Sequence, residues 1–90
     1  MEFEWDTAKA ESNERKHGVS FAFASGVFLD EHLKQHLDER SVGEERWIAI
    51  GLVDGREIVV AYTLRDNVVR LISARGADKY EREDYWLGSV

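Results

Sequence analysis

Five arginines lie in one apolar stretch of this chain, and their side chains could bind phosphate. They are Arg46, Arg56, Arg65, Arg70 and Arg75. The same stretch, residues 46–75, holds only three acidic residues, although the whole chain carries a formal net charge of −6. A guanidinium stays charged near neutral pH and grips phosphate through two parallel N–H donors. The placement of the arginines therefore points to a bound polyanion, and RNA is the leading candidate.

Metal-free cleavage of RNA makes three demands on a site. The 2′-hydroxyl must lose its proton, the charge of the pentavalent phosphorane must be stabilised, and the leaving 5′-oxygen must gain a proton. Arginines suit the second task by contacting the phosphate and its transition state, whereas Lys79 and His17 are candidates for handling the protons. The expected site residues are Arg46, Arg65, Arg70, Arg75, Lys79 and His17.

Each of these side chains also has a plainer interpretation. Arg46 follows two glutamates and could form surface ion pairs, which contribute only ~0–1 kcal/mol. Arg75 could pair with Glu57 or with an acid near the C-terminus. His17 stands at a predicted helix C-terminus, where the helix dipole stabilises its charged form. The sequence leaves both interpretations open for each residue.

A metal site is the other chemistry that the residue types allow. His32 and His36 are four residues apart, so a helix would place both imidazoles on one face near Asp30, a spacing that can hold zinc or nickel. Nothing else nearby completes a set of four ligands except acids, which occur throughout the chain. We therefore expect no metal and no cofactor, and a metal-dependent hydrolase remains an alternative.

Composition limits what can position these side chains. The 90 residues leave room for one domain, spanning 1–90, and 43% of them are hydrophobic, which is enough for an autonomous core. There is no cysteine, so thiol chemistry and disulfides are excluded. No apolar run approaches the ~20 residues of a membrane helix, and the N-terminus is acidic. We expect a cytoplasmic protein that has no membrane partner.

The first half of the chain predicts two helices. Residues 3–5 alternate apolar and acidic side chains, as in a short strand or an anchoring arm, and Asp6 can cap a helix that runs through Lys16. Ser20 can cap a second helix over residues 21–28, whose apolar residues cover most of its circumference. This second helix is expected to be largely buried.

The second half predicts a small antiparallel sheet. Residues 30–45 carry a weak pattern, which we interpret as an edge strand and a loop. Residues 47–53, 56–64 and 68–74 are rich in β-branched and aromatic side chains, and turn signals separate them. Residues 77–87 then predict a helix. The expected fold class is α+β, with two N-terminal helices, an antiparallel β-meander of three or four strands, and a C-terminal helix.

Register decides whether the arginines meet. If both hairpin turns have two residues, Thr63 pairs with Arg46 on one neighbouring strand and with Arg70 on the other. The side chain of Arg65 then points to the same face of the sheet. A one-residue slip at the second turn would move Arg70 and Arg75 each to the opposite face of the sheet. Both faces of this sheet are apolar, so we expect the chain's own helices to cover one face and a partner to cover the other.

Short motifs follow one another along essentially the whole chain. They include Phe3-Glu4-Trp5-Asp6, Lys16-His17-Gly18-Val19-Ser20-Phe21, Gly43-Glu44-Glu45-Arg46, Tyr62-Thr63 and Ile72-Ser73-Ala74-Arg75. In type and order they resemble those of the BrnT toxins. The resemblance implies a toxin of a type II toxin–antitoxin pair, with a RelE-like ribonuclease fold, that cleaves RNA and thereby inhibits translation and growth.

The resemblance also implies a partner. In the BrnT family this is a BrnA-type antitoxin with a ribbon-helix-helix domain, which blocks the toxin, and the chain would then meet DNA only indirectly, through that antitoxin. A different function stays open: the chain could be a non-enzymatic binding module that acts only by holding a DNA-binding partner. Because the chain is acidic, we expect the free protein to bind RNA weakly and with strong salt sensitivity.

Overall fold

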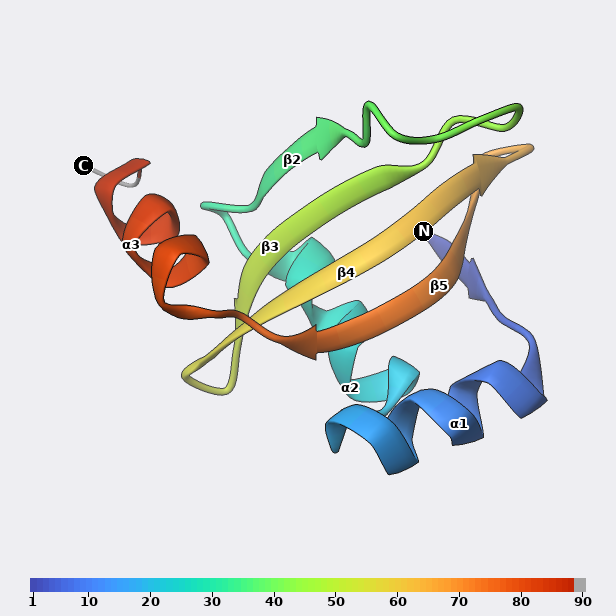
Figure 1. Cartoon of the computed structure of the whole chain (residues 1–90), viewed down its shortest axis with the longest axis horizontal. Helices are drawn as coiled ribbons and strands as arrows, with labels where there is room; N and C mark the ends of the chain where they lie inside the picture. The colour runs from blue at the N-terminus through green and yellow to red at the C-terminus, as the bar shows by residue number, and fades with distance from the viewer. Residues whose placement is uncertain (89–90) are drawn as a thin grey trace.

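The computed structural model describes residues 1–88 as a mixed sheet with helices on both of its faces (Figure 1). The elements are β1 (Glu2–Glu4), α1 (Thr7–His17), α2 (Phe21–Ala24), the 3-10 helix η1 (Ser25–Leu29), β2 (Lys34–Leu37), β3 (Trp47–Val53), β4 (Arg56–Arg65), β5 (Val68–Gly76) and α3 (Lys79–Gly88). The five strands lie in the order β1-β5-β4-β3-β2. Within residues 1–88, no helix is long and apolar enough to cross a membrane.

The two N-terminal helices begin where the sequence predicts. The Asp6 carboxylate accepts a hydrogen bond from the Lys9 N–H, and the Ser20 hydroxyl accepts one from the Phe23 N–H, so both predicted caps are confirmed. The single helix predicted over 21–28 is only half right, because its second part is η1. The tighter turn brings the Val27 backbone onto β3, where a Cβ at Gly51 would lie 3.0 Å from the Val27 carbonyl oxygen.

The strand layout is partly as predicted. The antiparallel meander of β3, β4 and β5 is confirmed, and β2 is the antiparallel edge strand beside β3. The short strand that the sequence suggested at the N-terminus is confirmed as β1, and the correction concerns the sheet: β1 is a fifth strand that pairs with β5 in parallel, Glu4 facing Arg70. The sheet is therefore mixed, and its first strand precedes the helices. The three residues of β1 are too few for their sequence to indicate which strand they will pair with.

A β-bulge in β5 decides where two of the arginines point. On a regular strand Arg70 and Arg75, five residues apart, would face opposite sides of the sheet. The pairing of β4 with β5 shifts by one residue between Ala61 and Tyr62, which leaves Ile72 as the bulged residue. Arg75 therefore points to the same side as Arg70.

The two faces of the sheet have different covers. The hydrophobic core lies between the sheet and the helices α1, α2 and η1, which confirms that the chain's own helices cover one face. Its most buried members include Phe21, Val27, Ile58, Val60 and Ala74. The helix α3 lies against the other face at one end, beside β2 and β3 (Figure 1). The remainder of that second face is left open, and we call it the open face.

The aspartate Asp30 anchors α3 to the sheet. Its Oδ2 accepts hydrogen bonds from the Tyr85 hydroxyl and from the Leu52 N–H at 2.8 Å, and its Oδ1 accepts one from the His32 N–H at 2.9 Å. Tyr85 is only 2% exposed. Burial, together with the hydrogen bond to Asp30, raises the pKa of Tyr85 to about 12. The hydroxyl therefore stays protonated and donates at every ordinary pH.

A Tyr85→Phe variant is expected to lose about 1.5 kcal/mol of unfolding free energy, because a buried hydrogen bond to a carboxylate disappears. Urea denaturation at pH 7 measures the loss. The difference from wild type should persist below pH 10 and vanish as the pH rises through about 12, since the wild-type phenol then ionises. The matched control is Tyr80→Phe on the same helix, where the side chain is 79% exposed and no loss is expected.

Candidate functional site

A cleft of about 680 Å³ lies on the open face, between the segment that continues β2 and the beginning of α3. Apolar side chains of β3 and β4 form its floor, and charged side chains form its walls. The lining residues are His36, Leu37, Asp38, Glu39, Arg40, Arg46, Ile48, Val59, Ala61, Ser73, Arg75 and Glu81. Two of the predicted site residues, Arg46 and Arg75, are among them.

Arg46 enters the cleft just before β3 begins. Its Nε lies 3.2 Å from Oδ2 of Asp38, which is only 6% exposed. Arg40 donates to the same carboxylate from its backbone N–H at 3.0 Å and from its Nε at 3.3 Å. Hydrogen bonds from Arg40, with the charge of Arg46, lower the pKa of Asp38. The terminal amino groups of Arg46 have no hydrogen-bond partner within residues 1–88.

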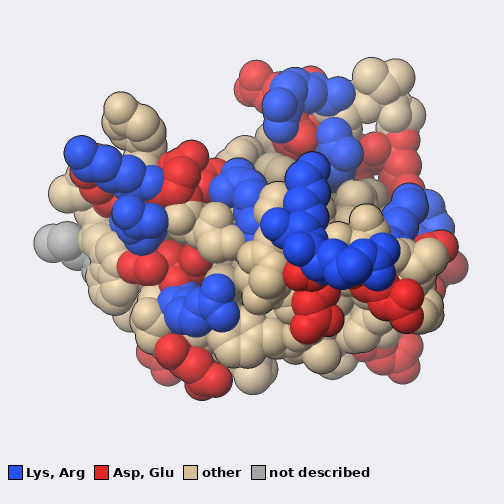
Figure 2. Space-filling model, turned by 60° about the horizontal axis from the view of Figure 1, so that its bottom comes forward, with Lys and Arg blue, Asp and Glu red and all other residues tan. Residues whose placement is uncertain are grey.

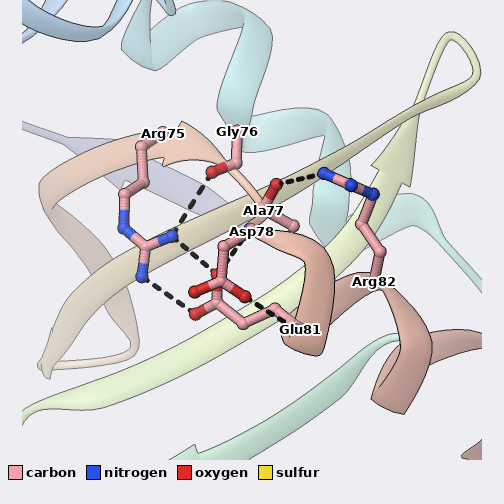
Figure 3. A network of polar contacts seen from close by, with 6 residues as sticks. All are labelled: Arg75, Gly76, Ala77, Asp78, Glu81 and Arg82. Carbon is pink, nitrogen blue, oxygen red and sulfur yellow. Dashed lines mark hydrogen bonds and ion pairs between the residues drawn. The ribbon is translucent and has the colours of Figure 1, made fainter.

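Arg75 reaches the cleft from the end of β5. Its Nη1 and Nη2 lie 2.7 and 2.9 Å from the two carboxylate oxygens of Glu81, and Nη1 also donates to the Gly76 carbonyl at 3.3 Å (Figure 3). This ion pair raises the pKa of Arg75 and lowers that of Glu81. The predicted pairing of Arg75 with an acid near the C-terminus is thereby confirmed, and the acid belongs to α3.

Arg65 and Arg70 lie together outside the cleft, at the β4–β5 hairpin. The predicted pairing of Thr63 with Arg70 is confirmed. Arg65 forms a two-point ion pair with Glu44, with both distances 2.9 Å, and Nη1 of Arg70 lies 3.6 Å from Glu4. The structure thus divides the four arginines into two pairs, Arg46 with Arg75 inside the cleft and Arg65 with Arg70 beside it.

The two predicted proton handlers are not brought to the arginines. His17 is exposed at the end of α1, and α1 packs on the covered face of the sheet through Asn13 and Ala74. Lys79 is exposed on α3 and lines a separate groove with Trp86. Neither side chain lines the cleft.

His36 is the imidazole that sequence analysis did not assign to this site. It lies on β2, pairs with Ile48, is exposed and lines the cleft. The available signal was the alternation of Lys34, His36 and Asp38, which places them on one face of a strand. The helix on which His32 and His36 would share a face does not form, because β2 begins at Lys34, as the predicted edge strand requires. Within residues 1–88, no three histidines or acids lie close enough together to hold a metal ion.

All four arginines form ion pairs with carboxylates. Few acids occur within residues 46–75, but the partners Glu4, Asp38, Glu44 and Glu81 come from outside that stretch. In the view of Figure 2, positive and negative side chains are intermixed, and no large area carries one sign only. Except at Asp38, which is buried, both partners of these pairs are partly exposed, and such pairs contribute little stability, so a phosphate can compete for the guanidinium groups.

The sequence of this chain matches a known protein family over most of its length. The model of a family described as "Ribonuclease toxin, BrnT, of type II toxin-antitoxin system" matches residues 5–81. A comparison with curated proteins finds no match. Because the family match covers most of the chain, from Trp5 on β1's C-terminal side to Glu81 on α3, the chain belongs to the BrnT family of ribonuclease toxins of type II toxin–antitoxin systems.

Proposed function

We propose that this chain is an endoribonuclease that cleaves RNA in the cleft without a metal ion, and that it thereby inhibits translation and growth. The observation that carries the proposal is the match of a ribonuclease toxin family to residues 5–81. The cleft supports it by supplying a concave site of nucleotide size whose lining includes three arginines, Arg40, Arg46 and Arg75. A RelE-like fold is part of the same proposal and is carried by the family resemblance.

In this proposal, the role of each residue in the reaction follows from its position in or near the cleft. Arg46 and Arg75 stabilise the charge that develops on the phosphorane, since both line the cleft. His36 exchanges protons with the 2′-hydroxyl or the 5′-oxygen, because an imidazole can both accept and donate a proton and His36 lines the cleft. Arg65 and Arg70 contact neighbouring phosphates of the same RNA. Lys79 and His17 lie outside the cleft and have no role in this version.

The ion pairs set a condition on RNA binding. A phosphate must either displace a carboxylate or use guanidinium donors that the carboxylate leaves free. Arg46 offers its terminal amino groups, because Asp38 contacts only its Nε. The two-point pair of Arg65 with Glu44 leaves fewer donors free. RNA affinity should accordingly be modest and fall steeply with salt.

A BrnA-type ribbon-helix-helix antitoxin is the proposed partner, and the chain would act in the cytoplasm. Family membership implies an antitoxin, and the type follows from the resemblance to BrnT toxins. The antitoxin would block RNA cleavage, and DNA would be contacted by the antitoxin alone.

Inducing this chain alone is expected to stop growth and degrade cellular RNA, whereas co-expression of the neighbouring reading frame should restore growth. The purified chain should cut RNA equally well in the presence of EDTA and leave 2′,3′-cyclic phosphate ends, because the 2′-hydroxyl is the nucleophile. Growth arrest is scored by colony counts and cleavage by gel electrophoresis of labelled RNA. Cleavage that EDTA abolishes would contradict the metal-free chemistry.

A second function has one observation in its favour. All four arginines form ion pairs with carboxylates. A non-enzymatic module that acts only through a DNA-binding partner does not need these arginines to bind RNA, so the ion pairs would not reduce its function. Pure, folded chain that leaves RNA intact while still binding the antitoxin would establish this alternative.

A further inference from the structure

The guanidinium of Arg75 has one edge occupied and one edge free. A guanidinium offers five N–H donors in a rigid fork, so a carboxylate or phosphate can bind across Nη1 and Nη2 or across Nε and Nη2. Glu81 binds across Nη1 and Nη2 at 2.7 and 2.9 Å. Every contact of Arg75 in Figure 3 leaves from the side of Gly76 and Glu81, and Nε has no partner within residues 1–88.

Glu81 is itself held in place by the first turn of α3. Its Oε1 accepts a hydrogen bond from the Asp78 N–H at 2.9 Å, and its own N–H donates to the Asp78 carboxylate at 2.8 Å. This reciprocal pair is a capping box, which fixes both residues at a helix start. Nη1 of Arg82 closes the same turn on the Ala77 carbonyl at 2.9 Å (Figure 3). The carboxylate that meets Arg75 is therefore rigid.

Arg65 provides the contrast within the same molecule. Glu44 binds Arg65 across Nε and Nη2, the edge that Arg75 leaves free. The Arg65 pair is also more exposed, with 52% and 43% of the two side chains open to solvent against 42% and 30% for Arg75 and Glu81. Only Arg75 and Glu81 of these four side chains line the cleft.

We infer that Glu81 is a positioning residue for RNA cleavage: it fixes the Arg75 guanidinium from one edge and so directs the Nε and Nη2 edge toward a phosphodiester in the cleft. The inference rests on the proposed ribonuclease function. It also gives α3 a part in the reaction, because the first turn of that helix sets the orientation of a side chain that the sheet supplies. A carboxylate that merely blocked Arg75 would have the opposite effect on the rate.

The test is a double-mutant cycle of Glu81→Gln and Arg75→Ala on the full chain. Glu81→Gln keeps an oxygen for the Asp78 N–H but removes the charge that holds Arg75, so kcat should fall roughly ten- to a hundredfold, the cost of a misplaced catalytic group. KM should not rise, since a negative charge near the RNA is removed. In the Arg75→Ala background, Glu81→Gln should change kcat no further, because Glu81 acts through Arg75. Glu83→Gln, an exposed charge-matched change on the same helix, should leave kcat at the wild-type value.

Three outcomes would overturn the inference. They are an equal loss of kcat from Glu81→Gln in both backgrounds, a gain in kcat from Glu81→Gln, and a loss that only follows a lower melting temperature. Binding of an uncleavable 2′-O-methyl RNA, measured over the same cycle, separates the two proposals. If the wild-type chain binds this RNA but does not cut the natural one, the proposed function is contradicted. In that case, if the effect of Glu81→Gln on RNA affinity depends on whether Arg75 is present, the result still supports the inference that Glu81 positions Arg75. Wild-type chain that does neither overturns both.

Discussion

An Arg75→Ala variant is expected to cleave RNA about 10²–10³-fold more slowly than the wild-type chain, the usual effect of removing one donor aimed at a developing oxyanion. The loss should fall mainly on kcat, because the charge that Arg75 stabilises develops fully only in the transition state. Arg46→Ala, on the opposite wall of the cleft, should behave alike. Single-turnover cleavage of a labelled RNA at saturating protein measures the effect without product release.

The control for this loss is Arg56→Ala, which also removes one positive charge from the sheet, at the start of β4. Arg56 lies over the Phe23 ring, 5.3 Å from its centroid, and does not line the cleft. This variant should cleave at the wild-type rate. Arg65→Ala and Arg70→Ala should instead weaken RNA binding and reduce its salt dependence, because phosphate contacts release counterions. Equal losses of kcat in Arg56→Ala and Arg75→Ala would mean that net charge, and not contact in the cleft, controls cleavage.

The local features of the fold could be predicted because their causes are local. The two-residue turn between β3 and β4 has positive φ angles at Asp54 and Gly55, and the turn before β5 has them at Asp66 and Asn67, residue types that tolerate this conformation. With both turns fixed, the pairing of Thr63 with Arg70 follows by counting. The helix caps depend in the same way on neighbouring residues.

The arrangement of charges could not be predicted, because it depends on contacts between distant segments. Glu44 meets Arg65 across 21 positions and Lys34 meets Asp84 across 50, and nothing in the spacing of these residues selects one acid over another. The bulge at Ile72 is a second nonlocal feature. A sequence pattern with a period of two assigns Arg75 to the covered face, and only the shifted register returns it to the cleft.

The two histidines His17 and His36 show that a site residue is hard to predict when the sequence pattern of its strand is weak. His17 lies at the end of a helix that the sequence predicts correctly, yet this helix packs on the face opposite the cleft. His36 lies on a four-residue edge strand whose polar alternation resembles a loop. Edge strands lack one neighbour and so need little apolar pattern, which is why the sequence predicted this strand only weakly and did not assign its exposed imidazole to the site.

An Asn13→Ala variant is expected to unfold with about 3 kcal/mol less free energy than wild type, which is large for a chain of this size. The Asn13 amide donates to the carbonyls of Ala74 at 2.8 Å and Val19 at 3.2 Å, and its oxygen accepts from the Ala74 N–H at 3.1 Å. β1 pairs with β5 only as far as Arg70, so Asn13 takes the place of a strand partner at Ala74. Alanine would leave these buried groups without partners, and the melting temperature should fall by roughly 12–24 °C.

Ser12→Ala is the matched control for this prediction, because Ser12 is the exposed neighbour of Asn13 on α1. The change also removes a polar side chain from the helix but breaks no buried hydrogen bond, so stability should stay within about 0.5 kcal/mol of wild type. Calorimetry of both variants gives the comparison. Equal, small shifts would mean that water satisfies the edge of β5 when Asn13 is absent, and that α1 is held to the sheet by its apolar contacts alone.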